Sequence, residues 1–206
     1  MRFTVGSRAR GRASTLALLV LGLLAGCSRS TDPRLYTLVA RQGSATYPAT
    51  GTLEVRRPSI AGYLDRREIV RSVLGERLEL SSDANWAEPL DAMFGRVLAA
   101  DLALRLPRSR VLTDLNTLGA VADTRLDLEV QRFEQGPDGV VLQVLIALRR
   151  GEQTVPVGLE AITLQDRVTS HATEAVVAAM NGLLGELADR IARMVATPPA
   201  SASTPP

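Results

Sequence analysis

The stretch TRLDLEV at residues 124–130 alternates apolar and polar side chains without a break. Successive side chains of a β-strand point to opposite faces, so this period of two predicts a strand with one buried face. The sequence GPDG at 136–139 is rich in turn-forming residues, and an apolar segment at 140–148 follows it. Together the three segments predict an antiparallel hairpin.

The returning segment at 140–148 is apolar on both faces, and Gln143 is the only polar residue within one of them. A strand that needs cover on both sides is typical of the centre of a sheet or of a contact with a partner. Residues 153–164 could add a third strand, and Pro156 and Gly158 place that strand at an edge.

Shorter strands are expected at 34–39, 52–57, 68–73 and 76–80, with a strand or turn at 110–113. Pro58 either ends the second of these strands or places it at an edge of the sheet. The third and fourth form a hairpin around Leu74-Gly75, and the polar run at 81–85 stops the fourth. The packing candidates in the first two strands are Leu35, Tyr36, Leu38, Leu53 and Val55.

Two segments have the apolar spacing of amphipathic helices. The first is expected to begin near Asn85, whose spacing to Glu88 matches a capping box, and to end near Arg105. Its predicted apolar face consists of Trp86, Leu90, Met93, Phe94, Val97, Leu98 and Leu104. The second helix spans about 171–195, and Thr169 or Ser170 is its expected cap. Its apolar face consists of Val176, Val177, Met180, Leu184, Leu187, Ile191 and Val195.

The elements follow the order strands, helix, strands, helix. Because each apolar helix face must cover a sheet, we predict an α/β (α+β) fold of one domain. In this fold a mixed β-sheet is covered by two amphipathic helices.

The N-terminal segment 1–26 has the layout of a lipoprotein signal peptide. Its first part is basic, and the apolar run at 15–24 is too short for a spanning helix, which needs about 20 residues. The residues LAGC at 24–27 resemble the lipobox of bacterial lipoproteins. This resemblance implies that Cys27 receives lipid and becomes the first residue of the mature chain.

Residues 27–33 would then be a lipidated tether, 34–196 the folded domain and 197–206 a disordered tail of Pro, Ser and Ala. One acyl chain binds a membrane only marginally, whereas bacterial lipoproteins carry two or three. The mature protein would therefore stay attached to its membrane. By resemblance to enterobacterial sorting rules, Ser28 in place of Asp favours the outer membrane, with the domain on its periplasmic face.

Composition narrows the possible function classes. The sequence has 24 basic residues, all of them Arg, and 22 acidic ones. Removal of four Arg with the signal peptide leaves 24 − 4 = 20 basic residues, and a mature net charge near −2 gives no reason to expect nucleic-acid binding. Cys27 is the only cysteine, so after lipidation none remains for a disulfide or a thiolate metal site.

The sequence lacks the P-loop lysine and the G-x-S-x-G and H-E-x-x-H motifs of hydrolases. We interpret His171, the only histidine, as a capping or surface residue. Asp127 and Glu129 would stand roughly 7 Å apart on one strand face, as paired carboxylates do in some glycosidases. Arg125 shares that face, which favours a salt-bridged surface. We therefore expect no enzymatic activity, and no cofactor apart from the lipid on Cys27.

Two features are candidate interfaces. Trp86, the only tryptophan, is expected to pack in the core, and an interface anchor is the alternative because Trp is enriched at binding hot spots. Arg66, Arg67 and Arg71 form a basic cluster, which is either a solvated edge or a contact for lipid phosphate or an acidic partner. The apolar strand at 140–148 and the hairpin at Gly75 are further candidates.

The order of several motifs resembles one known family. These motifs are Tyr63-Leu64-Asp65-Arg66 with Ile69-Val70, followed by Trp86-Ala87-Glu88-Pro89-Leu90. The sequence is similar there to the ABC-type transport auxiliary lipoproteins (PqiC/YmbA-like), and the resemblance covers about residues 16–195. The lipobox, Tyr36-x-Leu38, Arg132-Phe133 and the long last helix also fit. Members often carry a Trp in the strand after the 136–139 turn, where this chain is aliphatic.

The resemblance implies an outer-membrane lipoprotein subunit of an MCE-type (PqiABC-like) intermembrane lipid transport system that supports membrane integrity. Its implied partner is an MCE-domain (PqiB-like) protein that forms a periplasmic tunnel, and a homo-oligomeric ring is compatible with this role. Two alternatives stay open. One is a stand-alone periplasm-facing lipoprotein that itself binds and shields a lipid. The other is a lipoprotein hydrolase, which the missing motifs disfavour.

Overall fold

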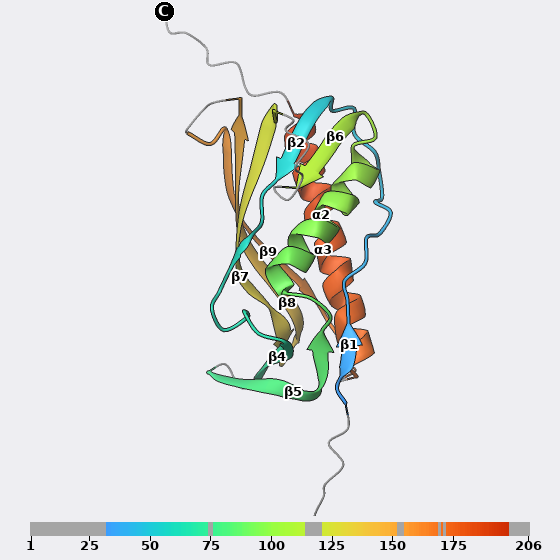
Figure 1. Ribbon diagram of the computed structural model, residues 1–206, viewed down its shortest axis with the longest axis vertical. Coiled ribbons are helices and arrows are strands. Elements are labelled where there is room, and N and C mark those ends of the chain that lie inside the picture. Colours follow the sequence, from blue (N-terminus) through green and yellow to red (C-terminus); the bar gives the residue numbers. More distant parts are fainter. Residues whose placement is uncertain are drawn as a thin grey trace, which may run out of the picture. The chain divides into compact units, whose positions relative to one another are not determined.

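The predicted hairpin forms the longest strands of the protein. In a computed structural model, β7 (Thr124–Gly136) pairs antiparallel with β8 (Gly139–Arg150). β9 (Gly158–Asp166) pairs with the other edge of β8, so β8 is central and β9 is an edge among the described strands (Figure 1). The structure therefore confirms the predicted hairpin, the central position of the strand at 140–148 and the edge position of the third strand. The structure describes residues 32–73, 76–113, 121–151, 155–168, 170 and 172–197.

Several predicted features lie outside the described residues. They are the signal peptide, Cys27, the Leu74-Gly75 turn, Thr169, His171 and the tail beyond Thr197. The account that follows concerns Pro33 onward, which forms a compact unit of its own.

The other edge of β7 pairs in turn with three short parallel strands, namely β2 (Gly51–Val55), β3 (Ser59–Ile60) and β4 (Glu68–Val73). The sheet branches beyond them. One branch adds β6 (Ser109–Thr113) beside β2. The other adds β5 (Arg77–Trp86) beside β4, and then β1 (Arg34–Tyr36) beside β5. Parallel and antiparallel pairs therefore coexist, and the predicted mixed sheet is confirmed.

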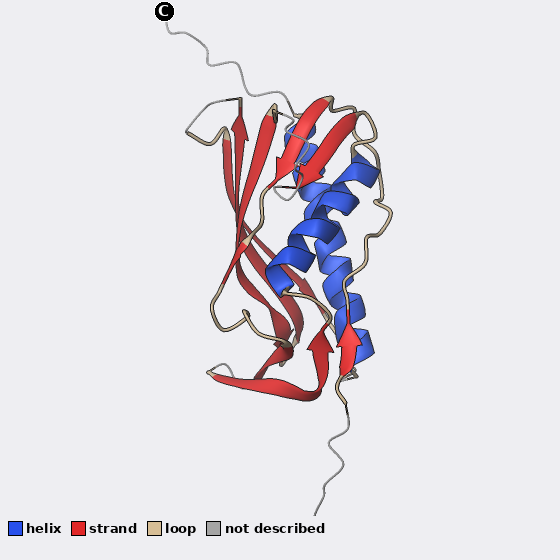
Figure 2. Ribbon diagram, in the orientation of Figure 1, coloured by secondary structure: helices blue, strands red, loops and turns tan. Residues whose placement is uncertain are grey.

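Helices α2 (Leu90–Arg105) and α3 (Thr173–Ala196) cover one face of this sheet (Figure 2). The alternate residues Leu126, Leu128 and Val130 of β7 are buried beneath them, as the period of two predicts. Phe94 of α2 meets Phe133 of β7 edge to face, with ring centroids 5.5 Å apart. Burial of one such side chain contributes roughly 1.5–3 kcal/mol, so this helix–sheet contact is a principal part of the core.

The start of α2 differs from the prediction. Residues 81–85 do not stop the strand, because β5 continues to Trp86, and Asn85 does not cap a helix. The helix begins at Leu90 with Pro89 in the N-cap position and no side-chain cap. Ala84 and Asn85 of the polar run pair with β1, and Asn85 also pairs with Glu68 of β4, so the end of the run is extended. The backbone N–H of Trp86 then donates to the carbonyl oxygen of Arg67 at 2.7 Å.

Some packing predictions were also wrong. Leu35 is 67% exposed and Leu104 is exposed on α2, whereas Leu38 and Leu53 are buried as expected. The predicted strand at 34–39 ends at Tyr36. Ala172 occupies the N-cap position of α3, and the hydroxyl of Ser170 only accepts a hydrogen bond from its N–H at 3.2 Å. Among the described residues, neither helix is long and apolar enough to cross a bilayer.

Candidate functional site

A groove of about 330 Å³ lies where β1 meets the end of β5, and we call it the β1–β5 groove. Its lining consists of Leu35, Asp65, Arg66, Arg67, Asn85, Trp86, Ala87, Glu88 and Pro89. Leu35 is paired with Asn85 across the two strands, and the 65–67 loop flanks the other edge of β5 through its bond to Trp86. The fold thus brings Arg66 and Trp86 together, although 20 residues separate them in sequence.

The two walls of the β1–β5 groove differ in chemistry. Leu35 forms an apolar wall, while the indole of Trp86 is only 5% exposed, so most of it packs in the core. Arg66 and Arg67 are exposed, and neither guanidinium has an ion-pair or hydrogen-bond partner among the described residues. Two arginines without partners beside an apolar wall can bind an anion that carries an apolar part.

Arg71 lies away from this groove, so the predicted cluster of three arginines is divided. It lines a second cavity of about 480 Å³, together with Arg34, Glu79, Leu80, Ser81, Ser82, Asp83, Ala172, Thr173 and Glu174. Its guanidinium donates to the hydroxyl of Thr173, the first residue of α3, at 3.0 Å. Arg71 therefore fastens β4 to the helix start.

The second cavity has mixed charge. Arg34 contacts Glu174 at 3.5 Å, and the hydroxyl of Tyr36 donates to the same carboxylate at 2.8 Å. The backbone N–H of Glu174 and the Tyr36 hydroxyl together lower the pKa of this carboxyl group. Because two arginines face three carboxylates here, the cavity is a poorer anion site than the β1–β5 groove.

The helix-free face of the sheet carries an apolar patch, which we call the outer patch: Leu145, Ala147, Leu159 and Ala161. These residues pair across β8 and β9, and they alternate with Ile146 and Ile162, which are buried beneath the helices. Leu159 is 75% exposed. Because β9 also has an open edge among the described strands, this region can receive a partner.

The carboxylates considered for catalysis have different partners. Asp127 pairs with Arg149 at 2.8 Å and with Arg56 at 3.8 Å, as expected for a salt-bridged surface. Glu129 accepts a hydrogen bond from Gln131 at 3.3 Å instead. Within the part of the chain that the structure describes, no three His, Cys, Asp or Glu side chains are arranged to hold a metal ion.

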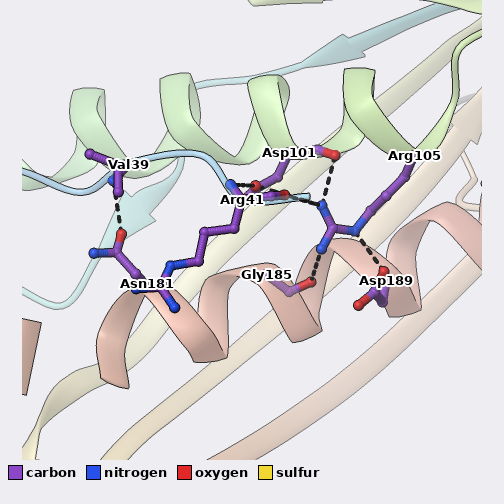
Figure 3. Close-up of polar contacts among 7 residues, drawn as sticks. All are labelled: Val39, Arg41, Asp101, Arg105, Asn181, Gly185 and Asp189. Carbon is purple, nitrogen blue, oxygen red and sulfur yellow. Dashed lines mark hydrogen bonds and ion pairs between the residues drawn. The ribbon is translucent and has the colours of Figure 1, made fainter. Parts of the chain in front are cut away.

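The sequence analysis missed a buried ion cluster around Arg105, which is 1% exposed (Figure 3). Its guanidinium donates to the carboxylate of Asp189 at 2.6 Å and to the backbone carbonyls of Arg41, Asp101 and Gly185 at 2.9–3.0 Å. The available signal was the i,i+4 spacing of Asp101 and Arg105 within the otherwise apolar segment 97–105 of this helix. Because its partners lie on both helices, Arg105 joins α2 to α3.

This cluster also fixes the segment 37–49, which we call the strap. The backbone N–H groups of Val39 and Arg41 donate to Asn181 on α3 at 2.8 Å and to Asp101 on α2 at 2.6 Å (Figure 3). Burial raises the pKa of Asp101, although its hydrogen bond from Arg41 acts in the opposite direction. The strap therefore connects β1 to both helices through polar contacts.

Comparison with known proteins places these features in a family. A family model described as an ABC-type transport auxiliary lipoprotein component matches residues 36–192. The chain belongs to this family. The matched span contains the strap, α2, most of α3 and most of the lining of the β1–β5 groove. The predicted resemblance is confirmed.

Solved structures show the same fold. Protein XCC0632 from Xanthomonas campestris has a TM-score of 0.65 and 20% identity, and the alignment covers 77% of this chain and 92% of that one. An uncharacterized protein gives a TM-score of 0.62 at 20% identity, with 78% and 99% of the two chains covered. A PelC dodecamer from Paraburkholderia phytofirmans is more distant, with a TM-score of 0.37, 15% identity, and 71% and 92% covered. No curated protein sequence matches the chain.

Proposed function

We propose that the protein is the outer-membrane lipoprotein subunit of an MCE-type intermembrane lipid transport system. The main support for this proposal is family membership, because the family consists of auxiliary lipoprotein components of transport systems. In the proposed role, Cys27 bears the lipid and the domain faces the periplasm. The partner is an MCE-domain protein that forms a tunnel, and a homo-oligomeric ring stays part of the prediction.

The outer patch supports a docking role. Leu159 presents a large apolar side chain to solvent at the open edge of the sheet, beside Ala161 and Leu145. Clustered exposed apolar residues next to an open strand edge are typical of surfaces that bind another protein. This patch is our candidate for the surface that contacts the tunnel protein.

The linings of the two cavities disfavour the alternative of a lipid carrier. Sites that enclose small apolar ligands are lined mostly by apolar side chains with few polar groups. Most residues that line the second cavity are charged or hydroxylated, and the β1–β5 groove combines arginines with acidic residues. Such linings suit contacts with proteins or head groups better than they suit an acyl chain.

A pull-down from crosslinked membranes tests the proposal, with the full-length lipidated chain as bait and Cys27→Ala as the anchoring control. We expect an MCE-domain protein to be recovered with the wild type. Leu159→Glu should reduce this recovery about tenfold or more, because the new charge would lose its hydration in the contact. The matched variant Leu104→Glu changes an exposed leucine on α2 and should leave recovery unchanged.

The outcomes separate the function from the docking surface. Absence of any MCE-domain protein, with lipid copurifying with a monomer, would support the carrier alternative and reject the transporter role. Equal recovery with Leu159→Glu and the wild type would keep the transporter role but exclude the outer patch as its contact.

A further inference from the structure

We propose that the β1–β5 groove docks phospholipid head groups of the membrane that holds the protein. This inference rests on the proposed function, since it requires lipid on Cys27. It assigns to the groove a role distinct from that of the outer patch, which is the candidate contact for the protein partner.

Chain length keeps the groove close to the membrane. Arg34, the first residue of β1, is 34 − 27 = 7 residues from Cys27. A fully extended chain spans at most about 3.6 Å per residue, so β1 begins within about 25 Å of the lipidated residue. Leu35, the apolar wall of the groove, follows at once. The exposed groove residues therefore lie within reach of the head-group layer.

The charges of the groove fit a phosphate group. Arg66 and Arg67 have no ionic partner among the described residues, and a guanidinium binds phosphate oxygens in a bidentate manner. Glu88 is already paired with Arg96, so Asp65 is the acid of the lining that has no ion pair within the described residues. Among the lining side chains without an ion pair within the described residues, Arg66 and Arg67 against Asp65 give 2 − 1 = +1.

The apolar wall favours a lipid over a free acidic peptide. Leu35 is 67% exposed on the strand that follows the tether. Transfer of such an apolar side chain from water into the interfacial region of a bilayer is favourable. An arginine near an anionic membrane surface contributes about 1 kcal/mol to the free energy of binding, which corresponds to about fivefold in affinity. Loss of Arg66 and Arg67 together should therefore weaken the contact roughly 30-fold.

The single tryptophan of the chain provides the assay. In a reporter protein with Trp86→Phe and Leu35→Trp, the only indole lies on the exposed wall of the groove. The full-length lipidated reporter is placed in phosphatidylethanolamine–phosphatidylglycerol vesicles that contain brominated chains, which quench indole fluorescence on contact. We expect strong quenching, and we expect Arg66→Glu with Arg67→Glu to abolish most of it.

A matched control lies on and beside β6, at the opposite end of the domain from β5 (Figure 1). Arg108→Glu with Arg110→Glu makes the same charge change at two exposed arginines and should leave quenching intact. Circular dichroism checks folding of every variant. If the reporter does not fold, hydrogen exchange of residues 63–69 in the unmodified groove, with and without vesicles, gives the same comparison.

Four results would overturn the proposal. Equal quenching in the two arginine double variants would exclude head-group docking by the groove. Unchanged quenching together with lost recovery of a protein partner would assign the groove to a protein contact. Failure of the wild type to float with vesicles would remove the anchor itself, and with it the proposed function, whereas flotation without quenching rejects only the groove.

Discussion

Replacing Arg105 by Met tests whether the buried ion cluster holds the strap and both helices together. Methionine keeps much of the aliphatic length but removes the guanidinium. The substitution would delete all four hydrogen bonds that Arg105 donates from its side chain. It would also leave Asp101, which is 1% exposed, without its neighbouring cation.

The expected loss of stability is large. Removing one partner of a buried ion pair costs about 3–5 kcal/mol, because the remaining charge is left without compensation. Asp189 retains some contact with solvent, since its side chain is 18% exposed, so we expect a loss of about 4 kcal/mol in the free energy of unfolding. This is a large fraction of the roughly 5–15 kcal/mol that stabilises an ordinary domain.

Urea denaturation followed by circular dichroism measures this loss. The control is Arg190→Met on α3, whose ion pair with Glu186 is exposed and spans 3.6 Å. Exposed pairs of this kind contribute about 0–1 kcal/mol, so the control should lie close to the wild type. A loss below about 1 kcal/mol for Arg105→Met, or one equal to the control, would refute the role that we assign to the cluster.

Three further predictions follow from single contacts. Gly43→Ala should lower stability in the urea assay, because a Cβ there would lie 2.8 Å from Arg105 side-chain atoms; an unchanged midpoint would contradict this packing. Gly139→Ala should abolish most soluble expression, since Gly139 has a φ of +130° and a Cβ would collide with the backbone at the end of β9. Arg57 lowers the pKa of Asp91 below its ordinary 3.8, so this carboxylate stabilises the fold above that pH and the effect is lost as the pH falls through the lowered pKa. The stability difference between wild type and Asp91→Asn should therefore shrink on acidification, as urea titrations at several pH values can show.

Local patterns predicted the elements whose neighbours are close in sequence. The alternation at 124–130 and the turn at 136–139 place both strands of the hairpin, because each strand is the main partner of the other. The polar run at 81–85 misled the prediction. Its strand partners are β1 and the start of β4 at Glu68, and no local pattern indicates pairing across such distances.

The sequence predicted only part of the site, again because some partners lie far apart in the chain. Arg66 and Trp86 were chosen as residue types suited to binding, and the β1–β5 groove unites them. Arg71 was grouped with Arg66 by sequence proximity, but β4 carries it to a cavity beside α3. Arg105 looked like an ordinary helix end, because its carboxylate partner Asp189 is 84 residues away.

The strap has a mechanical consequence. β1 runs parallel to the end of β5, so a pull on the chain at Arg34 along the strand strains their hydrogen bonds together, in shear, and does not unzip them one by one. Tension transmitted beyond β1 acts on the hydrogen bonds of Val39 and Arg41. The first of these bonds connects the strap to α3 and the second connects it to α2, so both helices share the load. A domain tethered through this end can follow the movement of its membrane while the helix pair that carries its core stays closed.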